Sequence, residues 1–262
     1  MLHTAPAMFA SFSSLCPPAA AGLLLFACSA LAENPLQPIM CAPDKVVLHD
    51  DFSTPGPINK QQWEPRQGTQ WKIEDGVLRG QPSTSEHQAS VPSHKGLEPR
   101  IAAPGTPREF IAKFSVRFVG GSETDVSPFV EFGHHVCRLR LSSTGAELLA
   151  GPDAIRVAEA KEFHYEPGKW CHMLAELHGE DFVIQIADGP TLYARHALFA
   201  QPPPAGAAGL GLAGTRGGTA EIDDVTLSSV KPGTLPGWEA RRDAFPKFTP
   251  IAPPSKGKKA VE

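Results

Sequence analysis

The chain has 262 residues, of which 41% are hydrophobic, a share that excludes a wholly disordered protein. Its formal net charge of −4 argues against a nucleic-acid-binding protein, which needs a basic surface. The 27 prolines and 24 glycines favour many turns and short strands over long helices.

The first 32 residues contain no Lys, Arg, Asp or Glu and include an apolar run, 19–31, that ends in Ala-Leu-Ala. This pattern predicts a signal peptide at 1–32 and a secreted or periplasmic protein. The n-region lacks a positive charge, so a cytoplasmic chain with an apolar N-terminus is the alternative. A lipoprotein anchored at Cys28 is a weaker one. The run is too short to span a bilayer and no later segment is apolar enough, so we expect no membrane span.

A short linker is expected at 33–45, and apolar runs typical of strands follow it. They lie at 46–52, 71–74, 77–78, 110–119, 129–132, 136–141, 170–177, 182–187, 209–212 and 220–227. Asp75-Gly76 predicts a tight hairpin between two of them. The Pro-rich stretch 98–107 is expected to be a loop. Turn signals recur about every ten residues and no amphipathic helix is found, which predicts an all-β domain at 46–230: a two-sheet antiparallel jelly-roll sandwich.

The last segment, 231–262, differs in composition from the rest. Prolines interrupt it, and it carries seven basic and three acidic side chains. A short helix is expected near 237–245. The end, 256–259, is expected to be a solvated basic tail, although a contact with a polyanion is the alternative.

Removal of residues 1–32 leaves three cysteines, which permit at most one internal disulfide. Cys137 and Cys171 are the candidate pair because both lie in strand-like runs. The alternative is that both are buried thiols. Their spacings fit no zinc motif, since the sequence has no Cys-x-x-Cys.

Several segments together resemble the 3-keto-disaccharide hydrolase domain family, often labelled family-16-like glycoside hydrolase, which has a concanavalin-A-like jelly roll. The segments are Asp50-Asp51-Phe52, Trp71-x-Ile73-x-Asp75-Gly76-Val77-Leu78, Gly168-Lys169-Trp170 and Glu221-Ile222-Asp223-Asp224-Val225. The resemblance covers roughly residues 46–230. Residues 86–89 and 133–138 also resemble motifs of a short, stand-alone, exported branch.

The resemblance implies an exported, glycoside hydrolase-like protein acting on (3-keto-)disaccharides or glycosides, with carbohydrate as its partner. The same sandwich hosts enzymes and lectins. A non-catalytic carbohydrate-binding or adhesion module of laminin-G-like fold is therefore the alternative. A structural domain of a larger envelope assembly is a third and weaker interpretation.

The segment 221–227 departs from the pattern of family-16 glycosidases, which carry Glu-x-Asp-x-x-Glu or Glu-x-Asp-x-Glu on one strand. It begins with Glu221 and Asp223 but has no second Glu. Retaining hydrolysis requires two carboxyl groups about 5–5.5 Å apart. We therefore expect a closing strand with acids that cap it or face solvent, and no retaining glucanase.

The candidate catalytic residues lie in two polar segments, Glu86 with His87, and His134 and His135 with Arg138. If the sheet brings them together, they can bind a divalent metal, calcium or zinc-like. They can equally take a proton from beside a keto group, with Arg holding the oxyanion. The alternative is a pair of polar surface turns with solvated histidines.

Other polar and aromatic residues are weaker candidates. Trp63 is a candidate for stacking on a sugar ring, whereas core positions are preferred for Trp71 and Trp170. His172 is expected to be a strand histidine with a satisfied side chain. Four aspartates of the expected first and last strands are candidates for a calcium site, with solvated carboxylates as the alternative. They are Asp50, Asp51, Asp223 and Asp224.

Overall fold

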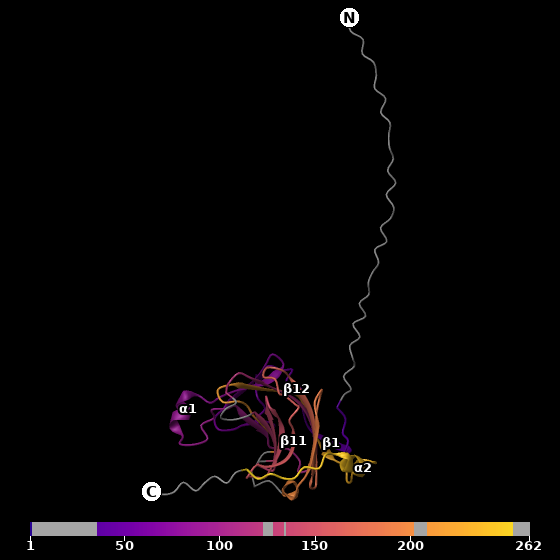
Figure 1. Cartoon of the computed structure of the whole chain (residues 1–262). Coiled ribbons are helices and arrows are strands. Elements are labelled where there is room, and N and C mark those ends of the chain that lie inside the picture. The colour runs from indigo at the N-terminus through magenta and orange to yellow at the C-terminus, as the bar shows by residue number, and fades with distance from the viewer. Residues whose placement is uncertain (2–35, 123–127, 134, 202–208, 254–262) are drawn as a thin grey trace, which may run out of the picture. The chain divides into compact units, whose positions relative to one another are not determined.

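The computed structural model describes residues 1, 36–122, 128–133, 135–201 and 209–253 (Figure 1). From Leu36 onward, these residues form one compact unit of two β-sheets packed face to face. The strand pairings within both sheets are antiparallel. The predicted all-β, two-sheet antiparallel sandwich is confirmed.

The larger sheet has nine strands, in the order β14-β13-β12-β7-β16-β5-β4-β2, and β1 also pairs with β16. Along the chain they are β1 (Pro43–Asp50), β2 (Gly56–Pro57), β4 (Gln70–Glu74), β5 (Val77–Gln81), β7 (Phe110–Val119), β12 (Cys171–His178), β13 (Asp181–Ile186), β14 (Thr191–Arg195) and β16 (Thr219–Val230).

The smaller sheet has seven strands, in the order β11-β10-β9-β8-β15-β6-β3. They are β3 (Glu64–Pro65), β6 (Arg100–Ala103), β8 (Phe129–Phe132), β9 (Cys137–Ser142), β10 (Gly145–Ala150), β11 (Ile155–Ala160) and β15 (Leu210–Ala213). Three short helices complete the described fold: α1 (Ser85–Ser90), the 3₁₀ helix η1 (Ala197–Ala200) and α2 (Trp238–Ala244). No helix in the described residues is long and apolar enough to cross a membrane.

The hairpin between β4 and β5 forms where the sequence predicts it. Asp75 and Gly76 both have positive φ, 54° and 75°, as a two-residue type I′ turn requires. Asp and Gly tolerate this region better than other residues, so the turn chemistry sets the register of the two strands.

The prediction of a loop throughout 98–107 is wrong, because β6 lies within it. Ala102 pairs with Gly211 of β15 on one side and with Glu64 of β3 on the other. The local sequence Arg-Ile-Ala-Ala has weak strand propensity, and pairing on both sides decides its conformation.

Aromatic side chains from both sheets meet in the core. Phe132 of β8 lies 5.8 Å from Phe110, 6.2 Å from Phe114 and 4.9 Å from Phe182, measured between ring centroids. These three partners belong to the nine-stranded sheet, so Phe132 joins the two layers. All four side chains are buried.

The candidate disulfide between Cys137 and Cys171 is wrong, and the alternative of buried thiols holds. Both cysteines are buried and free. They face the core from β9 and β12, which belong to different sheets. Burial raises the pKa of Cys171 to about 12 and that of Cys137 well above its ordinary value.

The buried thiols make a prediction about reactivity. A chain without residues 1–32 is expected to show almost no reaction with Ellman's reagent while folded, because thiolates are the reactive species. After denaturation without reductant, all three cysteines are expected to react, including the buried Cys41. A single reactive thiol after denaturation would contradict this and point to a disulfide.

A second, smaller hydrophobic cluster covers part of the outer face of the nine-stranded sheet. Its buried members are Met40, Cys41, Ile111, Leu174, Val183 and Trp238. Two of them precede β1 and one belongs to α2, so the described parts of the expected linker and tail pack onto the sheet. Farther along, Ile251 forms an antiparallel bridge with Arg156 of β11.

The carboxylate of Glu176 ties the segment before β1 to β12. Its side chain is completely buried and accepts hydrogen bonds from three consecutive backbone N–H groups. The donors are Ile39 (2.7 Å), Met40 (3.0 Å) and Cys41 (2.7 Å). A buried carboxylate of this kind requires such donors, because an unpaired one is costly.

Candidate functional site

Polar and charged side chains gather on the outer face of the seven-stranded sheet, where two neighbouring rows cross four strands. Cross-strand register places one row as Glu131, Arg138, Leu149 and Arg156, and the next as Phe129, Arg140, Glu147 and Glu159. The intervening residues of β8 and β9 are buried in the core. Side-chain alternation along the strands therefore builds this face.

The first row brings together two of the sequence-predicted residues, His135 and Arg138, through Glu131. The backbone N–H of His135 donates to Glu131 Oε1 (2.8 Å), and His135 Nδ1 lies 3.4 Å from the same oxygen. The His135 side chain is 43% exposed, whereas that of Glu131 is 16% exposed. A carboxylate beside Nδ1 orients the imidazole.

Arg138 completes this group. Its Cα is the cross-strand partner of Glu131, and its Nη2 donates to the carbonyl of Gly151 (3.0 Å). Burial lowers the pKa of Arg138, although nearby Glu131 acts to raise it. The buried Nε has no hydrogen-bond partner among the described residues. The group thus combines an imidazole, a carboxylate that orients it, and a guanidinium that has further N–H donors besides the one bonded to Gly151.

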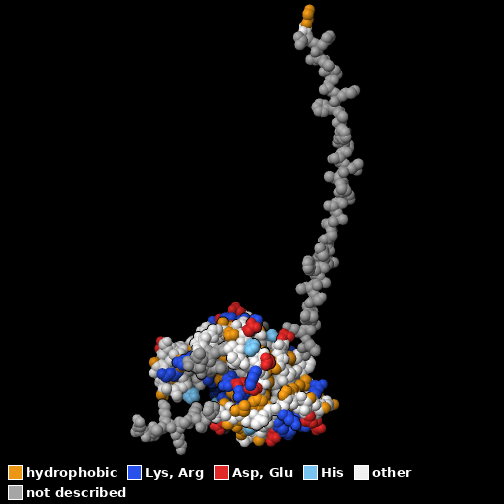
Figure 2. Space-filling view, viewed as in Figure 1, with side chains coloured by type: hydrophobic (Ala, Val, Ile, Leu, Met, Phe, Trp, Pro, Cys, Tyr) orange, Lys and Arg blue, Asp and Glu red, His pale blue; other side chains and the backbone are white. Residues whose placement is uncertain are grey.

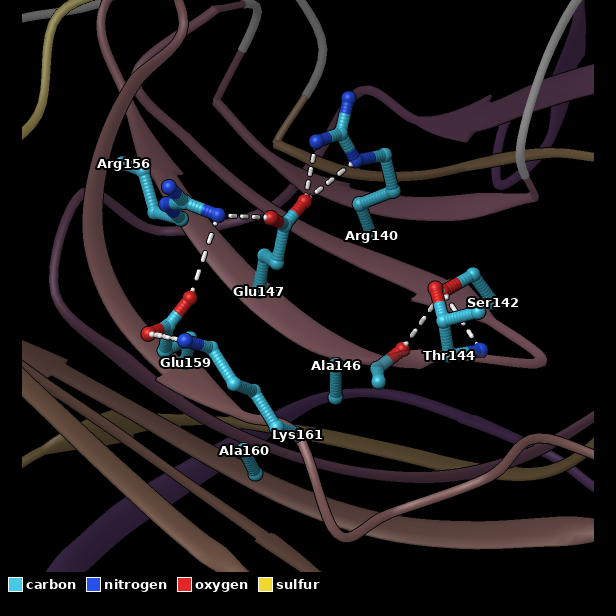
Figure 3. Close-up of a pocket in the computed structure, with 10 residues that line it drawn as sticks. Arg140, Ser142, Thr144, Ala146, Glu147, Arg156, Glu159, Ala160 and Lys161 are labelled. Atoms are coloured by element: carbon cyan, nitrogen blue, oxygen red, sulfur yellow. Dashed lines mark hydrogen bonds and ion pairs between the residues drawn. The ribbon is translucent and has the colours of Figure 1, made fainter.

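A groove of about 400 Å³ lies at the β10–β11 side of this face (Figure 3). Arg140 Nε and Arg156 Nη1 donate to opposite oxygens of Glu147, each at 2.7 Å. Arg156 Nη1 also lies 3.1 Å from Glu159, which pairs in turn with Lys161 (3.1 Å). Burial acts to raise the pKa of Glu147, but the two arginines hold it below its ordinary value.

An aromatic ring lies on the same face. Phe129 is half-buried, and the guanidinium of Arg100 lies 5.3 Å from its ring centroid. Arg100 is held by Glu98 (2.6 Å). Acidic and basic side chains also lie next to one another over the surface in view in Figure 2, with no extended basic surface there. An aromatic ring can stack on the apolar face of a sugar, and the charged groups around it can form hydrogen bonds with the hydroxyls.

The other predicted pair, Glu86 and His87, lies on α1, away from these rows (Figure 1). His87 packs its ring against Gly68, which follows β3. Strand β3 lies four strands from β9, about 19 Å at ordinary strand spacing. No hydrogen bond or ion pair between described residues joins α1 to His135 or Arg138. His134 lies outside the described residues.

The contact between His87 and Gly68 supports a double-mutant test. Gly68 has φ +71°, and a Cβ there would lie 2.5 Å from the His87 ring. Gly68→Ala is expected to lower the free energy of unfolding by about 2 kcal/mol, through backbone strain and this clash. In urea unfolding, His87→Ala should restore part of the loss in the double variant. Strictly additive effects would contradict the contact.

The expectation that Trp63 stacks on a sugar is wrong. Its side chain is only 1% exposed, and its ring packs against Phe52 with centroids 5.7 Å apart. Its Nε1 donates to Asp50 Oδ2 (3.0 Å). Trp63 is therefore a core residue, and its partner Asp50 is already engaged.

A metal site is not formed by the described residues, which contain no group of three His, Cys, Asp or Glu suited to hold an ion. Among the aspartates proposed for calcium, Asp51 accepts from its neighbour Ser53 (3.1 Å). Burial, together with Asp224 and Asp51, raises the pKa of Asp223. His172 is exposed on β12, and its Nδ1 lies 2.7 Å from Ser115 Oγ, as expected for a satisfied strand histidine.

Glu221 differs from the expectation of a capping or solvent-facing acid. Its side chain is 4% exposed, and Arg79 Nε donates to it at 2.7 Å. Arg117 pairs with its other oxygen and also lies 4.6 Å above the half-buried ring of Trp170. Trp71 is buried, as preferred. Both oxygens of Glu221 are therefore held by arginines.

Three residues of this face, Phe129, Glu131 and Glu147, are not among those that the sequence singles out. A signal for the first two was present, because the alternation at 129–132 places them on the face opposite Val130 and Phe132. Their proximity to Arg138 depends on the pairing of β8 with β9 and could not be read from alternation alone. Strand β10, with the sequence Gly-Ala-Glu-Leu-Leu-Ala, has no strand signal.

No protein-family model and no curated protein sequence matches the chain. A mutant of SCLam, a non-specific endo-β-1,3(4)-glucanase of family GH16, crystallised with an oligosaccharide at its active site, has a TM-score of 0.50 and 12% identity. The match covers 73% of this chain and 97% of the other. The carbohydrate-binding module CBM66 from Bacillus subtilis has a TM-score of 0.46 and 14% identity, covering 64% and 96%. At these identities the similarity shows the fold alone, which is the concanavalin-A-like jelly roll.

Proposed function

We propose that this chain is an exported carbohydrate-active protein that binds glycosides on the outer face of the seven-stranded sheet and cleaves 3-keto-glycosides there. The observation that carries the proposal is the group formed by His135, Glu131 and Arg138. It places a base, the carboxylate that orients it and a cation on one exposed face. The resemblance of residues 46–230 to 3-keto-disaccharide hydrolases supports the substrate class.

In this reaction, His135 takes the proton from C2 of the sugar, which the C3 ketone acidifies. Arg138 stabilises the enolate oxygen that develops at C3. The electron pair of the enolate then forms the C1–C2 double bond and expels the glycosidic oxygen, which leaves with the proton from His135. Addition of water across the double bond yields the free 3-keto sugar. Glu131 holds the imidazole in place throughout.

A non-catalytic carbohydrate-binding module is the second candidate, and the ion pairs on this face favour it. Glu147 is ionised between two arginines, and Glu98 is held by Arg100. The described carboxyl groups with a raised pKa, Glu176 and Asp223, belong to the nine-stranded sheet. Carboxylates that are held in ion pairs serve hydrogen bonding to hydroxyls better than proton donation.

Turnover distinguishes the two candidates. The purified chain is incubated with a 3-keto-glucoside, and release of the 3-keto sugar is followed by NMR. His135→Ala is expected to lower kcat at least 100-fold, as for loss of a general base. Glu131→Gln is expected to lower kcat less, because the amide keeps the size of the side chain but holds the imidazole less firmly.

His172→Ala is the matched control, because His172 is an exposed histidine on the other sheet and should leave turnover unchanged. If the unmodified chain binds glycosides without releasing a keto sugar, the second candidate replaces the first. If His172→Ala and His135→Ala reduce turnover equally, the assignment of the base is wrong.

A further inference from the structure

The groove of Figure 3 contains more hydrogen-bond donors than its own acceptors can use. We call the set of Arg140, Glu147, Arg156, Glu159 and Lys161 the charged groove. It has three cationic and two anionic side chains, within a protein of net charge −4.

Each carboxylate oxygen of the charged groove already has a cationic partner. One oxygen of Glu147 accepts from Arg140, and the other accepts from Arg156. The two oxygens of Glu159 pair with Arg156 and Lys161. Figure 3 shows the carboxylate of Glu147 lying between the two guanidinium groups.

Donors remain on all three cations. A guanidinium has five N–H donors and no acceptor, and an ammonium has three. Arg140 uses Nε and Nη2, which leaves Nη1 without a partner among the described residues. Arg156 uses Nη1 alone, and its buried Nε has no partner in the described part of the chain. The three cations outnumber the two carboxylates, so the charged groove favours a ligand that brings acceptors and negative charge.

The position of the charged groove links it to the proposed reaction site. Arg140 follows Arg138 by two residues on the same face of β9, a separation of about 7 Å along the strand. A ligand of more than one sugar unit that contacts Arg138 therefore reaches Arg140. The volume of about 400 Å³ lies within the range of small-ligand sites, about 300–1,000 Å³.

We propose that the charged groove is a subsite for an anionic sugar unit, whose carboxylate or sulfate group accepts from Arg140, Arg156 and Lys161. This inference rests on the proposed function only in placing carbohydrate on this face. The inference adds two properties of the ligand. The ligand has more than one sugar unit, and the sugar unit next to the one that contacts Arg138 carries a negative charge.

Binding to matched oligosaccharides tests this proposal. Isothermal titration of the full chain at low salt compares a neutral trisaccharide with its uronate and its sulfated counterparts. The unmodified chain is expected to bind an anionic form at least tenfold more tightly than the neutral one, and the preference should shrink at high salt. The anionic trisaccharide with the higher affinity, uronate or sulfated, shows which charged group the charged groove binds.

Arg140→Ala is expected to remove most of this preference, because it weakens binding of the anionic form far more than binding of the neutral form, and Arg140→Lys is expected to retain part of it. Arg140 is 45% exposed, so its loss should not unfold the chain. Arg195→Ala is the matched control, because Arg195 is 51% exposed and ion-paired with Glu180 on the nine-stranded sheet. It should leave the preference unchanged.

Equal affinity for neutral and anionic ligands, or equal losses in Arg140→Ala and Arg195→Ala, would overturn the proposal. Turnover is scored separately with the His135→Ala variant. A chain that prefers anionic sugars but releases no keto sugar upholds this inference and contradicts the catalytic proposal. A chain that turns over neutral substrates without any preference does the reverse.

Discussion

Replacing Glu176 with alanine is expected to lower the free energy of unfolding by about 4 kcal/mol. The carboxylate is completely buried and receives the backbone N–H groups of Ile39, Met40 and Cys41. Its removal leaves three donors without an acceptor, and each unsatisfied buried donor costs about 1–3 kcal/mol. The measurement is urea unfolding followed by tryptophan fluorescence, combined with limited proteolysis of the segment before β1.

Glu176→Gln is expected to lose about half as much, because one amide oxygen still accepts while the amide nitrogen faces an N–H group. Glu166→Ala is the control: Glu166 is 62% exposed and pairs with the exposed Lys169, so its loss should cost less than about 0.5 kcal/mol. If the segment before β1 is cleaved no faster in Glu176→Ala than in the unmodified chain, Glu176 is not what holds it.

Trp63→Ala is expected to lower the free energy of unfolding by about 4 kcal/mol, the usual cost of removing a large buried aromatic side chain. The ring is 1% exposed and packs on Phe52, and its Nε1 bonds to Asp50. Thermal and urea unfolding measure the loss. Affinity for carbohydrate, measured at a temperature where the variant is folded, should stay the same because the ring does not reach the surface.

Trp63→Phe separates the two contributions of this residue. It keeps most of the packing and loses the hydrogen bond to Asp50, so a loss of about 1–2 kcal/mol is expected. Trp170→Ala is the comparison, because Trp170 is half-buried beneath Arg117 and should cost less than Trp63→Ala. A Trp63→Ala variant of normal stability that no longer binds carbohydrate would restore the surface role that the structure contradicts.

The sequence was sufficient to predict which side chains of a single strand face the core and which face away from it. In β9, alternation places Cys137, Leu139 and Leu141 in the core and Arg138 and Arg140 on the other face, and the structure agrees. Alternation is a property of one extended strand, with a period of two residues. It requires no knowledge of the neighbouring strands.

The composition of the site could not be predicted in the same way. Glu131 meets His135 and Arg138 because β8 and β9 pair in one particular register. Glu147 meets Arg140 and Arg156 because β10 lies between β9 and β11. A shift by one residue in either pairing would move these side chains to the opposite face.

The two polar segments, 86–87 and 133–138, are a second case in which only the tertiary structure decides which residues are neighbours. Glu86 and His87 were expected to meet the histidines of 133–138, but α1 lies beside β3, at the far edge of the sheet from β9. Both segments are polar loops or turns in sequence, and polarity carries no information about which edge of a sheet a loop occupies.

The sequence by itself determined the strand pattern, the hairpin at Asp75-Gly76 and the all-β class, since these follow from local alternation and turn chemistry. Tertiary structure decided which strands are neighbours, where Glu176 finds its three donors, and which charges share a face. These features depend on contacts between residues that lie far apart in the sequence. The hydrogen bond from Cys41 to Glu176, for example, joins residues 135 positions apart. Such contacts are selected by the packing of the whole core, which no local segment encodes.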